Sequence, residues 1–146
     1  MSVISENRRA FFDYQILETF EAGIELKGFE VKAIKSGRIN LAGAFCVPQK
    51  NEIYLMNADI PPYQANNTPE NYDPLHARRL LLKKDEIKIL RDAVDNKGLR
   101  LIALKVYIKN NLIKLAIGLA RTKNKSDKRA AIIKKETRRE MRRTAE

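Results

Sequence analysis

The chain of 146 residues contains one cysteine, one histidine and no tryptophan, and these scarcities exclude several kinds of site. Cys46 alone cannot close an internal disulfide or supply the cysteine cluster of a zinc site. His76 has no second histidine with which to bind a metal or activate a nucleophile, so it is interpreted as a loop residue. Cys46 alternates with Phe45 and Val47, which is typical of a strand residue that packs or faces solvent.

Longer motifs are missing as well. No stretch approaches the roughly 18 to 20 apolar residues that span a bilayer. The N-terminus "MSVISENRRAFFDY" lacks the basic, apolar and small-residue order of a secretory signal. No glycine-rich phosphate loop, serine–lysine motif or metal-spaced carboxylate cluster occurs. We therefore expect a cytoplasmic protein that is not an enzyme and needs no cofactor or metal.

Positive charge is abundant and unevenly distributed. The net charge is +11, and residues 121–146 hold eleven Lys or Arg against four Asp or Glu. Such an asymmetry indicates a polyanionic partner, nucleic acid or, less often, an anionic membrane surface. A basic tail that only improves solubility is the alternative. Because Ile132, Ile133 and Met141 make no adequate apolar stripe, we expect this segment to be disordered when free and to fold on a polyanion.

Alternating apolar residues in the remaining part, residues 1–120, predict six strands in three hairpins. The clearest hairpin joins 99–110 to 112–120 through Asn110 and Asn111, which can adopt the positive φ angles of a two-residue turn. The other two join 13–20 to 24–28 at Gly23, and 44–47 to 52–56. The pattern favours a mainly β fold, a small closed or nearly closed antiparallel barrel.

These hairpins carry specific expectations about which residues face one another. The two-residue turn predicts the pairs Ile108 with Ile113, Val106 with Leu115, Leu104 with Ile117 and, on the opposite face, Tyr107 with Lys114. In the second hairpin, Phe45 and Val47 are expected to face Ile53 and Leu55. Pro48 indicates a strand end or an edge.

Two helices and one long loop complete the prediction. The segment 29–38 sets Val31 and Ile34 one turn apart and ends near Gly37. The segment 84–98 has an apolar stripe and ends at Gly98; the stripe consists of Ile87, Leu90 and Val94. Four of the five prolines fall between the predicted strand 52–56 and the second helix, so residues 60–75 should form an irregular loop.

Basic side chains form a candidate surface for RNA phosphates. Lys32, Lys35 and Arg38 recur at three-residue spacing around the first predicted helix. Further members are Arg78, Arg79, Lys83, Lys84, Lys105, Lys109 and Lys114. Tyr107 among these lysines is either an outward platform for a base or phosphate backbone, or part of an ordinary solvated sheet face. The pattern leaves both interpretations open.

Four blocks of the sequence match those of a known family in order and spacing. They are "NRRAFFDYQILETFEAGIELKGFEVKAIKSGRINLAGAF", "RRLLLKKDEI", "LIALKVYIKNNLIKLAIGLAR" and "SDKR", between Asn7 and about Arg129. With these blocks the chain resembles the SmpB family, the SsrA-binding proteins of bacterial trans-translation. The resemblance implies an OB-fold-like antiparallel barrel with accessory helices. It also implies binding to the tRNA-like domain of transfer-messenger RNA (tmRNA, SsrA RNA) and delivery of this RNA to ribosomes stalled without a stop codon.

The resemblance assigns RNA contacts residue by residue. Glu21 in "FEAG", Leu81 in "RLLLK" and Lys114 after "NNLI" match family contact positions. Lys83 stands where the family often has Asn or His, which keeps a donor but changes its geometry. The supporting phosphate contacts in the first block are Lys32, Lys35, Arg38 and Asn40. Tyr107 joins this set because of its place opposite Lys114.

The tail is implied to enter the vacant mRNA channel of the stalled 70S ribosome, to become helical along 16S rRNA and to license accommodation. The implied tail contacts are Asp127, Lys128, Arg129, Lys134, Lys135, Arg138 and Arg139. Ser126 and Thr137 stand where the family has frequent aromatics, so base stacking there is not available. Elongation factor Tu, acting through tmRNA, is a further implied partner, and we expect a monomer when the protein is free.

Two other functions differ from this reading in testable ways. A general RNA-binding or ribosome-associated protein would bind RNA without rescuing ribosomes. A magnesium-dependent nuclease would use acidic pairs such as Glu18 and Glu21, although nothing else completes such a site.

Overall fold

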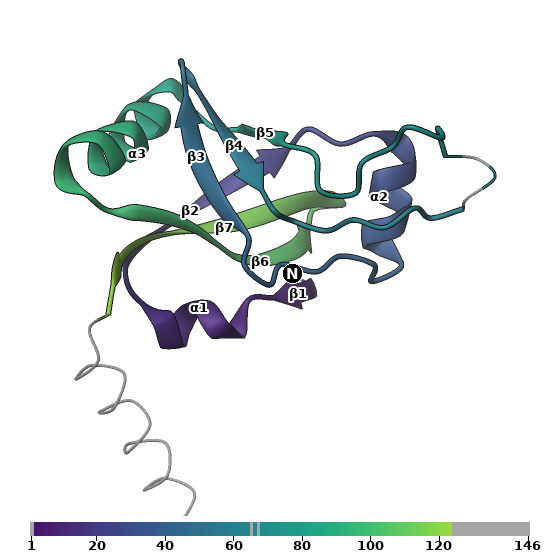
Figure 1. Cartoon of the computed structure of the whole chain (residues 1–146), viewed down its shortest axis with the longest axis horizontal. Helices are drawn as coiled ribbons and strands as arrows, with labels where there is room; N and C mark the ends of the chain where they lie inside the picture. The colour runs from purple at the N-terminus through teal and green to yellow at the C-terminus, as the bar shows by residue number, and fades with distance from the viewer. Residues whose placement is uncertain (1, 65, 67, 124–146) are drawn as a thin grey trace, which may run out of the picture.

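The computed structural model describes residues 2–64, 66 and 68–123, which form seven strands and three helices (Figure 1). The elements are β1 (Ser2–Glu6), α1 (Arg8–Asp13), β2 (Tyr14–Ile24), α2 (Gly28–Lys35), β3 (Phe45–Gln49), β4 (Glu52–Met56), β5 (Arg78–Leu81), α3 (Lys84–Lys97), β6 (Arg100–Lys109) and β7 (Leu112–Thr122). None of the helices within these described ranges is long and apolar enough to cross a membrane. The predicted tail contacts from Asp127 to Arg139 lie outside the described residues.

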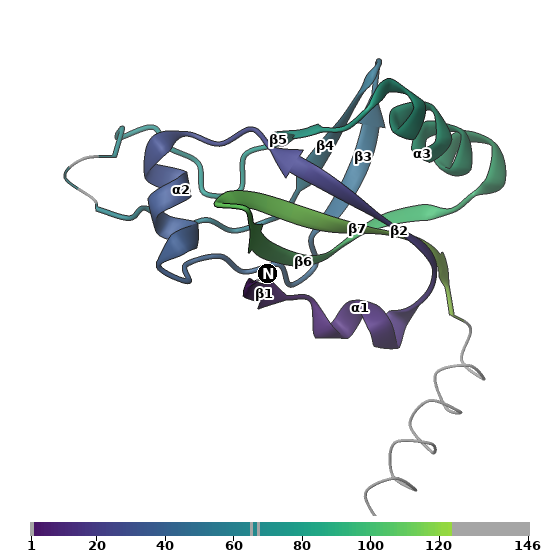
Figure 2. The ribbon, with the colours of Figure 1, turned by 180° about the vertical axis from the view of Figure 1, so that it is seen from behind.

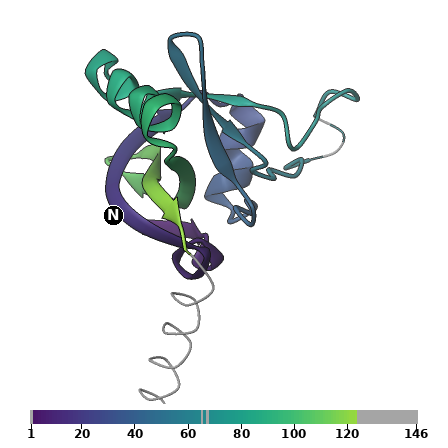
Figure 3. The same cartoon turned by 60° about the vertical axis from the view of Figure 1, so that its left-hand side comes forward.

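All strand pairings are antiparallel, and they close the sheet into a ring. The order is β6–β3–β4–β5–β2–β7, and β7 pairs again with β6. β1 lies on the same edge of β6 as β3, farther along the strand, where it pairs with residues 105–108. Figure 3 shows the curved strands of this ring. The mainly β class with accessory helices is therefore confirmed.

The sheet separates two apolar clusters. The larger one fills the ring with fully buried Ile53, Leu55, Leu80, Leu115 and Ile117 and receives Ile34 of α2 and Leu90 of α3. The smaller one lies outside the ring, where Ala10 of α1 covers side chains of β6 and β7. Figure 2 shows α1 along this side of β6 and β7. The outer face of this hairpin is thus covered in part rather than fully solvated.

The β6–β7 hairpin confirms three of its four predicted pairs and contradicts the fourth. Asn110 and Asn111 have φ angles of 50° and 67°, and Tyr107 pairs with Lys114. A bulge between Ala103 and Lys105 then places Ala103, instead of Leu104, opposite Ile117. Leu104 turns to the outer cluster and packs over Gly118, where an added Cβ would lie only 2.9 Å from Leu104 Cδ1.

The hairpin predicted at Gly23 is wrong. β2 runs unbroken from Tyr14 to Ile24, and Glu21, Ala22 and Gly23 pair with β7 inside the strand. Gly23 also pairs with Leu81 of β5, and a Cβ on Gly23 would lie 3.2 Å from Leu81 Cβ. Glycine favours this close approach between neighbouring strands, and no turn occurs at this position.

The predicted β3–β4 hairpin exists with a different register. The turn has only two residues, Lys50 and Asn51, so Cys46 pairs with Leu55 and Pro48 pairs with Ile53. Cys46 therefore faces the core, and its burial raises the pKa of its thiol to about 12. Phe45 and Val47 lie on the other face, so their predicted orientation is wrong. Pro48 lies beyond the β3–β6 pairing, which ends at Cys46, as expected for an edge position.

Both predicted helices and the long loop are confirmed. α2 is followed by Gly37 with φ 87°, and α3 ends at Gly98 with φ 64°. The described part of the segment 60–75 contains no strand or long helix, and it is anchored to α2. Tyr72 of this segment and His76, which follows it, contact the buried Glu30 carboxylate of α2 at 3.0 and 2.9 Å. His76 is thus a loop residue, as predicted.

Candidate nucleic-acid interface

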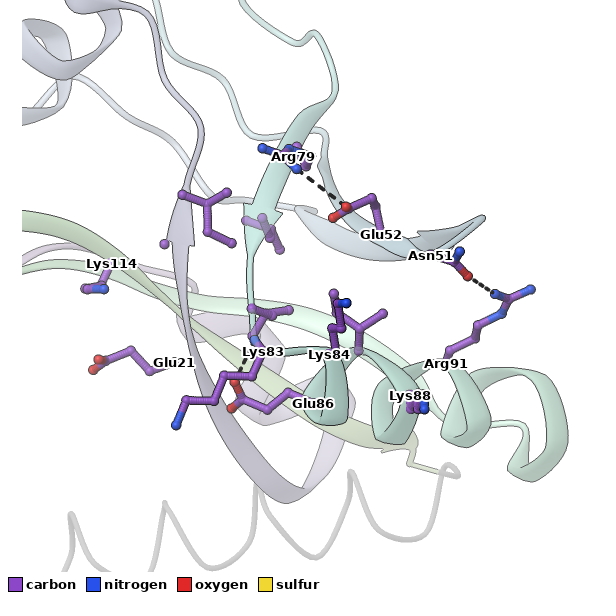
Figure 4. Close-up of a pocket in the computed structure, with 15 residues that line it drawn as sticks. Glu21, Asn51, Glu52, Arg79, Lys83, Lys84, Glu86, Lys88, Arg91 and Lys114 are labelled. Atoms are coloured by element: carbon purple, nitrogen blue, oxygen red, sulfur yellow. Dashed lines mark hydrogen bonds and ion pairs between the residues drawn. The ribbon is translucent and has the colours of Figure 1, made fainter.

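A groove of about 930 Å³ runs between the β2–β5–β7 surface and the N-terminal half of α3 (Figure 4). The sheet contributes Glu21, Gly23, Lys114 and Leu81, and α3 contributes one flank. The residues that carry its charge are Glu21, Glu52, Arg79, Lys83, Lys84, Glu86, Lys88, Arg91 and Lys114. We call this surface the lysine groove.

The floor of the lysine groove is one transverse row of the sheet. Gly23 of β2 pairs on one side with Leu81 of β5 and on the other with Lys114 of β7. Lys114 in turn pairs with Tyr107 of β6. Because Gly23 has no side chain, Leu81 can lie over Gly23. Leu81 itself remains 49% exposed and lines the groove. Residues distant in the sequence thus become neighbours through strand pairing alone.

The flank of the groove is a basic face of α3. Lys84, Lys88 and Arg91 follow one another at intervals of four and three residues, which places them on one side of the helix. Leu90 belongs to the opposite, buried side. Lys83 immediately precedes the helix, and its backbone N–H donates to the Glu86 carboxylate at 3.1 Å. This contact caps the start of α3.

The lysine groove is predominantly positive, and several of its positive side chains form no ion pair with the described residues. Six basic side chains face three acidic ones. Arg79 is bound to Glu25 at 2.7 Å and to Glu52 at 3.4 Å, so these charges largely satisfy each other. By contrast, four lysines form no ion pair of 4.0 Å or less with any described residue: Lys83, Lys84, Lys88 and Lys114. Unpaired ammonium groups in a groove are suited to binding phosphates.

Glu21 is the one acidic side chain on the floor. Its Oε2 accepts a hydrogen bond from the Tyr107 hydroxyl, and Lys109 Nζ lies 3.5 Å from the same oxygen. The Tyr107 hydrogen bond and the neighbouring Lys109 and Lys114 charges lower the pKa of Glu21. Burial and the bond to Glu21 raise the pKa of Tyr107. The carboxylate is therefore ionised, and the hydroxyl keeps its proton, at neutral pH.

The structure brings together only part of the predicted site. Glu21, Leu81, Lys83 and Lys114 line the groove, and Tyr107 contacts it through Glu21. Tyr107 lies on the outer face of the sheet opposite Lys114, as expected, but it is not an open platform, because this residue is 4% exposed and belongs to the outer cluster with Leu104 and Ala116. It cannot stack on a base without a rearrangement. Its hydroxyl is the part that reaches the site.

The α2 group lies elsewhere. Lys32, Lys35, Arg38 and Asn40 belong to α2 and the turn after it, at the opposite end of the molecule from α3 (Figures 1 and 2). Arg38 donates to the carbonyls of Pro62 and Tyr63 at 3.3 and 3.0 Å, and Asn40 accepts from the Ala42 N–H. Arg38 therefore binds the long loop, and Asn40 stabilises the turn that follows α2, whereas Lys32 and Lys35 are exposed.

Arg78 was expected in the basic surface, and this expectation is wrong. Its side chain is fully buried and paired with Glu30. Two basic residues of the lysine groove, Lys88 and Arg91, were not predicted from the sequence. Their spacing from Lys84, which places all three on one helix face, was the signal that could have identified them.

The nuclease alternative receives no support from the carboxylates. Glu18 and Glu21 pair with Leu119 and Ala116 in unbroken register, so they point to opposite faces of β2 and cannot share one ion. Within the described ranges, no three His, Cys, Asp or Glu side chains form a group that could hold a metal.

Fold and groove together define a class: a small, mainly antiparallel β protein with a lysine-rich groove on its outer surface. The chain belongs to the SmpB family, whose model, described as "SmpB protein", matches residues 4–146. A relative from Thermosynechococcus vestitus, named SsrA-binding protein, is 46% identical over 143 residues, covering 98% of this chain and 94% of the relative. Another SsrA-binding protein, from Ligilactobacillus salivarius, is also 46% identical over 143 residues, with 98% and 92% coverage.

A solved structure extends this similarity to three dimensions. It is described as "tmRNA-SmpB: a journey to the center of the bacterial ribosome", and its matching chain superposes with a TM-score of 0.69 at 43% identity. The match covers 90% of this chain and 95% of that chain. The fold is therefore shared with a chain of a structure whose description names tmRNA-SmpB and the bacterial ribosome.

Proposed function

We propose that this protein binds the tRNA-like domain of tmRNA through the lysine groove and delivers the RNA to stalled ribosomes in trans-translation. The carrying observation is that Glu21, Leu81, Lys83 and Lys114, assigned to RNA contact by family resemblance, lie around one groove. They reach it from three strands and a helix start. Membership of the SmpB family and the names of the relatives support the same RNA.

Each part of the groove has a distinct physical task. Lys83, Lys84, Lys88 and Lys114 neutralise backbone phosphates and supply most of the affinity. These contacts orient the RNA without reading its sequence. Leu81, half-exposed between them, contacts an apolar sugar or base surface. The protein supplies binding and positioning only, with no covalent chemistry of its own.

The tail proposal concerns residues 121–146 as a unit separate from 1–120. In it, Asp127, Lys128 and Arg129 with the later basic residues enter the vacant mRNA channel along 16S rRNA and become helical there. The high positive charge of this segment supports a polyanionic partner. Elongation factor Tu meets the protein through tmRNA, and the free protein acts as a cytoplasmic monomer.

Reconstituted trans-translation tests this proposal. Purified ribosomes stalled on an mRNA without a stop codon receive alanyl-tmRNA and elongation factor Tu, with or without this protein. The expected result is addition of the tmRNA-encoded tag only when the protein is present. Equal tagging in its absence would refute the proposal, and RNA binding without tagging would favour a general RNA-binding protein.

A further inference from the structure

Lys123, at the end of the described ranges, is bound twice to the end of α1. Its backbone N–H donates to the Asp13 carbonyl at 3.1 Å, and its Nζ donates to the Phe11 carbonyl at 3.0 Å. The last four carbonyls of a helix have no partner within the helix, and a lysine side chain is suited to bind them. One residue from the far end of the sequence thus satisfies two of these carbonyls. We call the two contacts the Lys123 clamp.

The helix that receives the clamp is itself fixed to the sheet. Before α1, the buried Asn7 donates from its N–H to the Leu104 carbonyl at 2.7 Å and from its Nδ2 to the Ala103 carbonyl at 3.0 Å. Within α1, Ala10 is buried in the outer cluster against β6 and β7. Figures 1 and 3 show α1 beside the end of β7. The Lys123 clamp therefore holds the chain to a helix that is anchored on β6.

The clamp continues the strand pairing by one residue. β7 ends at Thr122, which forms the last pair of the β2–β7 ladder with Tyr14. The bond from the Lys123 N–H to the Asp13 carbonyl adds one contact in the same direction. The first three residues of the tail are therefore attached to the sheet and α1, and residues 124–146 start from a fixed point.

Strand β7 connects this point to the lysine groove. Lys114 lies in the groove, and Thr122 lies at the other end of the same strand. The two are eight residues apart, and a strand covers about 26 Å over that length. Because one strand carries both positions, a fixed direction of the chain at Lys123 also fixes where the tail starts relative to RNA in the groove.

From this geometry, and resting on the proposed function, we infer that the Lys123 clamp positions the tail: it sets the direction in which residues 124–146 leave the sheet while RNA is held in the groove. Lys123 is a positioning residue. A tail that leaves in one direction searches a smaller volume, so its effective concentration at the vacant mRNA channel is higher. Loss of the ammonium contact should therefore slow tagging and leave RNA binding unchanged.

Lys123→Met tests the clamp in the full-length chain, because it removes the side-chain bond and keeps the apolar stem. The tagging rate in the reconstituted system should fall about threefold to tenfold, the usual effect of losing one hydrogen bond. The Kd for the tRNA-like domain and the melting temperature should stay almost unchanged. Lys123→Arg keeps a charged donor and should retain most of the wild-type rate. Lys125→Met removes the same charge two residues farther along, so it is the matched control and should tag almost as fast as the wild type.

A spacer separates positioning from a charge contact. Two glycines inserted between residues 123 and 124 keep the clamp and every charge but uncouple the tail from the clamp. This variant should lose tagging by a similar factor, and Lys123→Met should have almost no further effect within it. The same insertion between residues 144 and 145 is the control and should tag like the wild type. If Lys123 instead bound a phosphate, the two penalties would multiply.

The outcomes distinguish the inference from the function on which it rests. Undiminished tagging by Lys123→Met, equal losses for Lys123→Met and Lys125→Met, or penalties that multiply with the spacer would overturn the inference. Should Lys123→Met fail to fold, the spacer variant alone decides, because undiminished tagging by that variant would also overturn it. A wild-type protein that does not tag, or does not distinguish the tRNA-like domain from an unrelated hairpin, would instead refute the proposed function.

Discussion

Glu30 of α2 and Arg78 of β5 form an ion pair of 2.7 Å in which both side chains are fully buried. Arg78 also donates to the carbonyls of Ala58 and Pro74, at 2.8 and 2.9 Å. Tyr72 and His76 contact the same Glu30 oxygen. The pair therefore joins α2, the sheet and the long loop at a single buried point.

Breaking this pair should destabilise the fold strongly. Arg78→Met leaves the Glu30 carboxylate buried without its counter-ion, and loss of one partner of such a pair costs about 3–5 kcal/mol. The matched control is Arg79→Met, whose partners are exposed, so its loss should change the free energy of unfolding far less. Urea unfolding measures both. Similar losses for the two variants would contradict the structural role of Arg78.

The same pair predicts how stability depends on pH. Burial acts to raise the pKa of Glu30, but hydrogen bonds from Lys27 N–H, Arg78 and His76, with the Arg78 charge, outweigh it. The pKa of Glu30 is therefore below its ordinary value of 4.5 in the folded protein. Because the folded pKa is the lower one, the stabilisation is complete well above pH 4.5 and is lost as the pH falls through the folded pKa.

Urea unfolding from neutral pH into the acid range measures this dependence. Wild-type stability should fall below about pH 4.5, and Glu30→Gln, although less stable at neutral pH, should show a shallower fall there. Parallel pH profiles for the two proteins would show that Glu30 does not contribute to acid unfolding.

Lys114→Ala should weaken RNA binding with little effect on stability. Lys114 lies on the groove face, whereas its neighbour Leu115 is fully buried. Loss of one phosphate contact should reduce the salt slope by about one. Leu115→Ala should instead cost about 2–5 kcal/mol of folding free energy.

Lys97→Ala serves as the charge-matched control, because Lys97 lies at the end of α3 and does not line the groove. It should bind the tRNA-like domain almost as the wild type does. A large fall in melting temperature for Lys114→Ala, or equal binding losses for Lys114→Ala and Lys97→Ala, would count against the groove.

Removal of residues 127–146 should separate RNA binding from ribosome rescue. If the tail acts in the mRNA channel and the groove binds tmRNA, the truncated protein should keep its affinity for the tRNA-like domain and lose tagging in the reconstituted system. A variant with Lys134, Lys135, Arg138 and Arg139 changed to Gln should lose tagging too, since it lacks the charge. Undiminished tagging after truncation would refute the tail proposal.

Local patterns in the sequence predicted the elements that local forces determine. α3 has an apolar stripe and a terminal Gly98, and the β6–β7 turn has two asparagines with positive φ. The bulge could not be predicted because residues 101–104 are all apolar. Without alternating polar residues, the sequence does not indicate which of these side chains face the core. Gly23 was assigned to a turn because the local sequence does not show its close neighbour. That neighbour is Leu81, which comes from a distant part of the chain.

Short elements were missed for a similar reason. β1, α1 and β5 have five, six and four residues, too few to establish a period, and they are stabilised by pairing or packing with distant strands. The groove depends on the same long-range pairing, since Leu81 and Lys114 meet only through Gly23. The family resemblance could name these positions, but their common row in the sheet is a tertiary property.

The central claim is that the lysine groove recognises the tRNA-like domain of tmRNA. Its most direct test is the Kd of the full-length protein for that RNA and for an unrelated hairpin of equal length, over one salt series. We predict a Kd at physiological salt at least about 1,000-fold lower for the tRNA-like domain, the lower end of the range by which specific nucleic-acid binding typically exceeds non-specific binding. Equal affinity for both RNAs at every salt concentration would contradict the account.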